Sequence, residues 1–122
     1  MAAVVTRVDV KRVYEKPLPS DGTRVLVDRL WPRGLTKERA AVDLWLRGVA
    51  PSPELRGWFG HDPAKWEEFQ KRYRAELQRN QEAVADLRRK CGAGPVTFIY
   101  AARDEEHNSA RLLKDYLEQS DT

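Results

Sequence analysis

The run VTFIY (Val96–Tyr100) decides the predicted fold. It is a short, continuous apolar segment, preceded by the turn residues GAGP (Gly92–Pro95) and followed within a few positions by charged residues. A strand that is apolar at every position is typical of one buried on both faces of a sheet, and such strands occur mainly in parallel α/β sheets. The residues from about Glu105 to Glu118 predict an amphipathic helix after this strand.

Two more strands are predicted upstream of this run. Arg7–Tyr14 is rich in β-forming residues and partly alternating, and Arg24–Leu30 (RVLVDRL) follows the Pro/Gly turn segment Lys16–Gly22. Trp31–Gly34 (WPRG) then interrupts the pattern, because proline disfavours helix in the residue before it and glycine permits a turn. A structured loop is therefore expected after the second strand.

The middle of the chain predicts helices. Ser52 and Asp62 each precede a proline, which is the combination of an N-cap residue with proline at the first helical position. Apolar side chains recur at helical spacing from Trp66 to Leu77 and resume after a break near Asn80. The order of elements is thus ββ, helices, β, α, which predicts an α/β fold: a small three-layer-like domain with a short, mainly parallel sheet flanked by helices.

Length and composition favour one domain over residues 1–122. The chain has 122 residues, of which 41% are hydrophobic and 34% charged, enough to form one core. Its single cysteine, Cys91, cannot form an internal disulfide, and no long apolar segment is present, so we expect a soluble cytoplasmic protein without a membrane span. The chain has no zinc, calcium or nucleotide-binding motif, and neither a metal nor a cofactor is predicted. A net charge of +3 weakly favours anionic partners.

Two predicted strands end in charged pairs. Asp28 and Arg29 close the second strand, and Arg103 and Asp104 lie just beyond the third. If the strands are parallel, their carboxyl ends share one edge of the sheet, where α/β proteins commonly bind ligands. A helix beginning near Glu105 would aim backbone N–H groups at the same space. Arginines beside a helix N-terminus suit phosphate, sulfate or carboxylate, so a small anionic ligand is expected.

The candidate residues fall into two groups. His107 is the preferred general acid or base, because imidazole titrates near neutral pH, and Asp28 is the second candidate for moving a proton. The remaining polar and aromatic side chains near the two strand ends are candidates for binding the ligand: Arg29, Trp31, Arg33, Tyr100, Arg103, Asp104 and Asn108.

A purely structural interpretation competes with this one. Asp28 with Arg103, and Arg29 with Asp104, would then be ion pairs that close the sheet edge, with Asp104 serving only as the N-cap of the last helix. His61 is interpreted as a loop residue, because it directly precedes a helix start. The tryptophans are expected in the core, with Trp31 as the exception.

Four blocks of the sequence resemble a known bacterial family. They are RVLVDRLWPRG (Arg24–Gly34), APSPELRGWF (Ala50–Phe59), the helical stripe Phe69, Tyr73, Glu76 and Leu77, and IYAARDEEHNSA (Ile99–Ala110). Together they are similar to the YeaO-like (DUF488) family, a domain of unknown function. The resemblance implies an intracellular α/β domain and no established activity. It adds Arg56 to the ligand-binding candidates.

One residue departs from the family pattern. Where the family commonly has lysine, this chain has Arg103, which keeps the charge but favours a bidentate anion contact over proton transfer.

Two classes of function remain open, and the sequence does not decide whether the protein is an enzyme. The first is a small enzyme acting on a phosphorylated or carboxylated metabolite. The alternative is a non-catalytic module that binds a small anion, a nucleic acid or a protein partner, a homodimer included. Nucleic acid is the less favoured partner, since no groove-binding helix or aromatic RNA-binding motif is visible.

Overall fold

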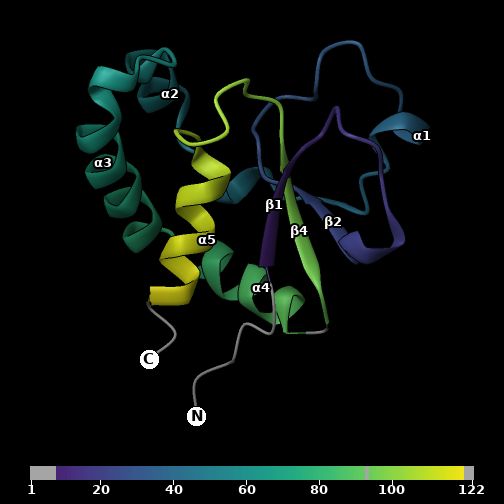
Figure 1. The fold of residues 1–122 in the computed structure, drawn as a ribbon. Helices are drawn as coiled ribbons and strands as arrows, with labels where there is room; N and C mark the ends of the chain where they lie inside the picture. The colour runs from purple at the N-terminus through teal and green to yellow at the C-terminus, as the bar shows by residue number, and fades with distance from the viewer. Residues whose placement is uncertain (1–7, 93, 120–122) are drawn as a thin grey trace.

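A parallel sheet forms the centre of the computed structural model, which describes residues 8–92 and 94–119 (Figure 1). Within these residues four strands are hydrogen-bonded in the order β1-β4-β2-β3, and every neighbouring pair is parallel. The strands are β1 (Val8–Arg12), β2 (Thr23–Leu26), β3 (Leu44–Trp45) and β4 (Val96–Tyr100). The α/β fold with a short parallel sheet, predicted from the sequence, is confirmed.

Strands β2 and β4 are neighbours in register, with Thr23 opposite Val96 and Leu26 opposite Ile99. Their carboxyl ends therefore lie side by side, as expected. Strand β2 ends at Leu26, earlier than predicted. The reason is that the Asp28 carboxylate accepts a hydrogen bond from the Ala101 N–H, at 2.9 Å. A side chain thus replaces the backbone carbonyl that would have continued the ladder. Strand β1 is likewise shorter than predicted, and Arg7 lies outside the described residues.

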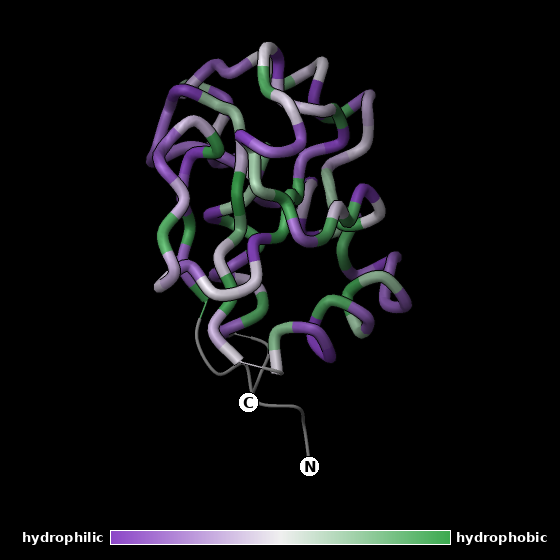
Figure 2. The backbone as a smooth tube through the Cα atoms, turned by 90° about the vertical axis from the view of Figure 1, so that its right-hand side faces the viewer, coloured by the Kyte–Doolittle hydropathy of each residue, from purple (hydrophilic) through white to green (hydrophobic). Residues whose placement is uncertain are grey.

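Alternate residues of the central strands enter two separate cores. Val25 and Phe98 belong to the larger cluster, which packs against the long helices, whereas Leu26 and Ile99 belong to a smaller cluster on the opposite face. The smaller cluster is covered by the segment after β2, with Trp31 packed against it. Figure 2 shows hydrophobic stretches through the middle of the molecule and hydrophilic ones mainly around its outside.

Helices flank the sheet on both sides. Figure 1 shows α2, α3 and α5 on one side of the strands and α1 on the other. None of the helices in the described part of the chain has the length and apolar character needed to span a bilayer. Their bounds are α1 (Lys37–Ala40), α2 (Pro53–Phe59), α3 (Trp66–Arg79), α4 (Gln81–Cys91) and α5 (Ser109–Gln119).

Both predicted helix starts are confirmed. The Ser52 hydroxyl caps α2 by accepting the Leu55 N–H at 3.1 Å, and Asp62 caps a short 3-10 turn that leads into α3. The predicted break near Asn80 separates α3 from α4. Helix α1 and the two-residue strand β3 were not predicted, because this segment has neither a long apolar run nor a clear period.

The start of the last helix was predicted wrongly. Helix α5 begins at Ser109 instead of near Glu105, and its first turn is capped by Asn108, whose Oδ1 accepts the Arg111 N–H at 2.9 Å. Asp104 instead closes a separate bend before the helix, since its Oδ1 accepts N–H groups from Glu106 and His107, both at 2.9 Å. Asp104 is therefore not the N-cap of α5, and His107 does not lie in the helix.

Candidate functional site

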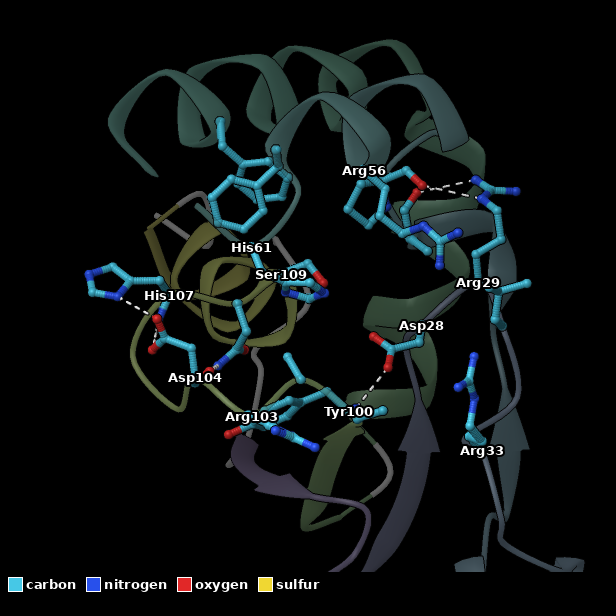
Figure 3. A pocket seen from close by; sticks show the side chains of 18 of the residues that line it. Asp28, Arg29, Arg33, Arg56, His61, Tyr100, Arg103, Asp104, His107 and Ser109 are labelled. Atoms are coloured by element: carbon cyan, nitrogen blue, oxygen red, sulfur yellow. Dashed lines mark hydrogen bonds and ion pairs between the residues drawn. The ribbon is translucent and has the colours of Figure 1, made fainter. Parts of the chain in front are cut away.

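A pocket of about 700 Å³ lies at the carboxyl edge of β2 and β4 (Figure 3). All ten residues that the sequence singled out line it: Asp28, Arg29, Trp31, Arg33, Arg56, Tyr100, Arg103, Asp104, His107 and Asn108. Their backbones belong to the loop after β2, helix α2, the end of β4 and the segment leading into α5. The parallel register brings the two strand ends together, and α2 closes a further side.

The pocket contains four arginines in two different situations. Arg29 is half-buried and anchored, because its Nε donates to the Pro51 carbonyl at 3.2 Å and its NH2 to the Ala50 carbonyl at 3.4 Å. The side chains of Arg33, Arg56 and Arg103 are exposed, and none forms an ion pair with residues 8–92 or 94–119. Three guanidinium groups at the pocket thus retain their full hydrogen-bonding capacity.

Asp28 is one of the two carboxylates that line the pocket within the described residues. Its Oδ2 accepts the Ala101 N–H at 2.9 Å. Burial raises the pKa of Asp28, against the smaller opposing effects of the Ala101 N–H and of electrostatic interactions with Arg56 and His61. The sheet-closing ion pairs that the sequence allowed, Asp28 with Arg103 and Arg29 with Asp104, do not occur in the described structure. These four residues are therefore not locked together at the sheet edge.

His107 is held by Asp104 and turned away from Asp28. The distance from His107 Nδ1 to Asp104 Oδ2 is 2.9 Å, and the imidazole meets the edge of Trp66 with ring centroids 5.4 Å apart. Hydrogen bonds from the His107 and Glu106 N–H groups lower the pKa of Asp104. In Figure 3 the His107 ring points outward from the pocket. His107 and Asp28, the two alternative candidates for moving a proton, therefore do not face one another.

The N-terminus of α5 faces the pocket, although it begins later than predicted. Ser109, its first residue, lines the pocket. Asn108 also lines it, but its amide is used within the chain: Nδ2 donates to the Asp104 carbonyl at 3.0 Å, and Oδ1 caps the helix. The role of Asn108 is thus to hold the start of α5 in place.

The remaining walls are mainly apolar and aromatic. Phe59 and Phe69 stack with centroids 4.4 Å apart, and both are buried. Trp31 donates from Nε1 to the Leu35 carbonyl at 2.8 Å and meets Trp45 edge-on at 5.4 Å. Tyr100 is buried at the end of β4, and burial raises its pKa. A ligand would meet a mixed surface, with arginines around an apolar interior.

Helix α3 supports the loop that holds Arg29. Glu76 accepts two hydrogen bonds from Ser52, from the backbone N–H at 2.8 Å and from the hydroxyl at 2.5 Å. One turn earlier, the buried Tyr73 hydroxyl donates to the Val49 carbonyl at 2.5 Å. These bonds fix residues 49–52, which supply the two carbonyls that bind Arg29. Both residues belong to the stripe that resembles the family, but neither of them was assigned a role at the site from the sequence.

Sequence reasoning also missed His61 as a lining residue. It was interpreted as a loop residue, and it is one, but it lines the pocket and acts electrostatically on Asp28. His61 has φ of 57°, directly after Gly60 at 54°, so the chain turns sharply at the end of α2. No periodicity signals such a turn. The described residues contain no group of three or more His, Cys, Asp or Glu side chains that could hold a metal ion.

Comparisons with known proteins place the chain among relatives of similar length. It is 46% identical over 112 residues to an uncharacterized protein of Mycobacterium tuberculosis (strain ATCC 25618 / H37Rv), which covers 92% of this chain and 94% of that protein. The uncharacterized protein YeaO of Escherichia coli (strain K12) is 42% identical over 113 residues, covering 90% of this chain and 96% of YeaO. No solved structure matches. A family model described as the inactive DUF488-N3 subclade matches residues 7–121, so the chain belongs to the YeaO-like DUF488 family.

Proposed function

We propose that the pocket binds a small organic anion, a phosphate or carboxylate, without converting it. The observation that carries the proposal is the convergence of four arginines from three separate segments on one pocket: Arg29 and Arg33 after β2, Arg56 on α2 and Arg103 after β4. Among the described residues, only two carboxylates, those of Asp28 and Asp104, line the pocket with these arginines. The Asp104 carboxylate already forms hydrogen bonds with Glu106 and His107. The lining thus has an excess of positive charge.

Arginine geometry favours oxyanions as ligands. The planar guanidinium presents paired N–H donors that match phosphate and carboxylate oxygens, and it stays charged at all relevant pH values. A volume of about 700 Å³ lies within the range of metabolite-sized sites. The apolar interior formed by Phe59 and Phe69 favours an organic anion over an inorganic ion.

Binding without turnover is favoured over catalysis for two reasons. The family model that matches the chain is described as an inactive subclade. In addition, His107, the preferred general acid or base, is held by Asp104 and its ring points outward from the pocket, which argues against its acting on a bound ligand. The small-anion module, one of the two classes left open by the sequence, is therefore the one proposed here.

The test compares two exposed arginines. Phenyl phosphate, benzoate and inorganic phosphate are titrated into wild type, Arg103→Ala and the control Arg39→Ala, whose side chain lies on α1 outside the pocket. A ligand at 100 times its Kd stabilises the native state by about 2.7 kcal/mol, which a thermal-shift assay detects easily. We expect an organic anion to raise the Tm of wild type and Arg39→Ala and to lose at least tenfold in affinity with Arg103→Ala. Equal shifts in all three proteins, or none, would contradict the proposal.

A further inference from the structure

The carboxylate of Asp28 divides the pocket into two chemically different parts. Its Oδ2 is used by the Ala101 N–H, whereas Oδ1 receives no hydrogen bond from residues 8–92 or 94–119. In Figure 3 this second oxygen points toward the middle of the pocket, between Arg56 and Tyr100. The interior therefore presents a hydrogen-bond acceptor, while the surrounding arginines present donors.

We infer that the ligand is an anion that also carries an N–H or O–H donor, and that Asp28 Oδ1 accepts this donor while the arginines bind the anionic group. The inference rests on the proposed function, since it adds a second recognition point to the same pocket. Removing a carboxylate from water is costly unless its oxygens are hydrogen-bonded, so a ligand donor placed at Oδ1 contributes favourably. A plain anion at the same place would instead be repelled by Asp28.

The fixed bond to Ala101 makes this subsite selective for donors. The Ala101 N–H can only be satisfied by an oxygen, so in Asp28→Asn the amide oxygen must stay on that side and its NH2 group must face the pocket. The substitution therefore turns the acceptor at Oδ1 into a donor while keeping size, shape and the bond to Ala101. Asp28→Asn should remain folded, because the bond that closes the end of the ladder is preserved.

The experiment uses matched probes that differ by one donor. Phenyl phosphate and its three aminophenyl isomers carry the same phosphate, and only the isomers carry a neutral amino group. Their Kd values are measured calorimetrically for wild type, Asp28→Asn and Arg103→Ala. We expect at least one isomer to bind wild type at least fivefold more tightly than phenyl phosphate does. With Asp28→Asn this preference should vanish, while phenyl phosphate itself binds as tightly as before or more tightly, because the repelling charge is gone.

The Arg103→Ala variant separates failure of this inference from failure of the proposed function. Loss of affinity for phenyl phosphate and for every isomer by a similar factor supports the shared anion site. If all probes bind and depend on Arg103, but no isomer is preferred or the preference survives in Asp28→Asn, the donor subsite is wrong and the anion pocket stands. If no probe binds wild type, both are wrong. Binding of phenyl phosphate by Asp28→Asn itself shows that the variant retains the pocket.

Discussion

At the scale of single residues, burial of the Asp28 carboxylate affects the stability of the fold. Its pKa is raised by burial, so the native state holds the proton of this carboxyl more tightly than the unfolded chain does. For such a group stability falls as pH rises from the unfolded carboxyl value, about 3.9, toward the higher native value, and stays reduced above it. The ionised form of Asp28 therefore costs the native state free energy at neutral pH.

This cost predicts a stabilising substitution. Asp28→Asn should raise the free energy of unfolding at pH 7 by about 1 kcal/mol, because it removes the buried charge and keeps the hydrogen bond to Ala101. The difference from wild type should shrink as the pH is lowered toward about 4, because the raised pKa lets the wild-type carboxyl take up its proton in the native state. Urea unfolding at the two pH values measures it. A variant less stable than wild type at pH 7 would show that the charged carboxylate supports the fold instead.

The individual site residues were predictable from the sequence only as a group. The charged pairs at two strand ends led to nine of the lining residues and the family resemblance added Arg56, but neither showed which side chains are available to a ligand. Asp104 and Asn108 are both good N-cap residue types, and the acidic residues after Asp104 imitate a first helical turn. In the folded protein the buried Asn108 caps α5, and Asp104 instead forms a hydrogen bond with His107. That competition cannot be decided from residue type.

At the scale of elements, the pocket depends on the contact between α3 and the start of α2. Glu76 holds Ser52 at the N-cap of α2, and the neighbouring carbonyls of Ala50 and Pro51 hold Arg29. Arg56 lies one turn into the same helix. Glu76 is therefore connected to two pocket arginines, through Ser52 and the segment around it.

The corresponding prediction concerns Glu76. Glu76→Ala should lower the free energy of unfolding by about 1–3 kcal/mol, because the Ser52 N–H loses its acceptor, and should weaken phenyl phosphate binding. Glu76→Gln retains one acceptor and should restore most of both. Glu68→Ala, which removes only an exposed pair with Arg72 on the same helix, serves as the control and should change stability by less than about 1 kcal/mol. If Glu76→Ala lowers stability but leaves affinity untouched at temperatures where it is folded, Glu76 does not position the arginines.

The elements themselves were predictable where the signal is local. Proline after an N-cap residue marked the starts of α2 and of the turn before α3, and the apolar stripe marked the buried face of α3. Strand β3 had no such signal, since its two residues are held by contacts with a distant part of the chain: the Asp43 N–H donates to Arg24 and the Leu46 N–H to Leu26. Such a short strand forms because the neighbouring strand, here β2, is already in place.

At the scale of the whole molecule, the parallel sheet explains why the site lies at one end. Parallel strands place all their carboxyl ends on one edge of the sheet. The order β1-β4-β2-β3 puts β4 beside β2, so residues some 70 positions apart in sequence meet at this edge. The hydrogen bond between Asp28 and Ala101 is an example. The apolar run of β4 predicted a buried strand in a mainly parallel sheet, but the order of the strands did not follow from it. The closure of the pocket by α2, and with it the approach of His61, follows from tertiary packing that no local pattern specifies.

The most direct test of the account is a ¹⁵N-HSQC titration of wild-type protein with phenyl phosphate. The anion pocket predicts saturable shifts that cluster on the amides of Arg29, Arg56, Ala101, Arg103 and Ser109, with little change on α1 or α4. Shifts spread over exposed lysines and arginines without saturation, or centred on α1 or α4, would contradict the claim that the strand ends form an anion-binding site.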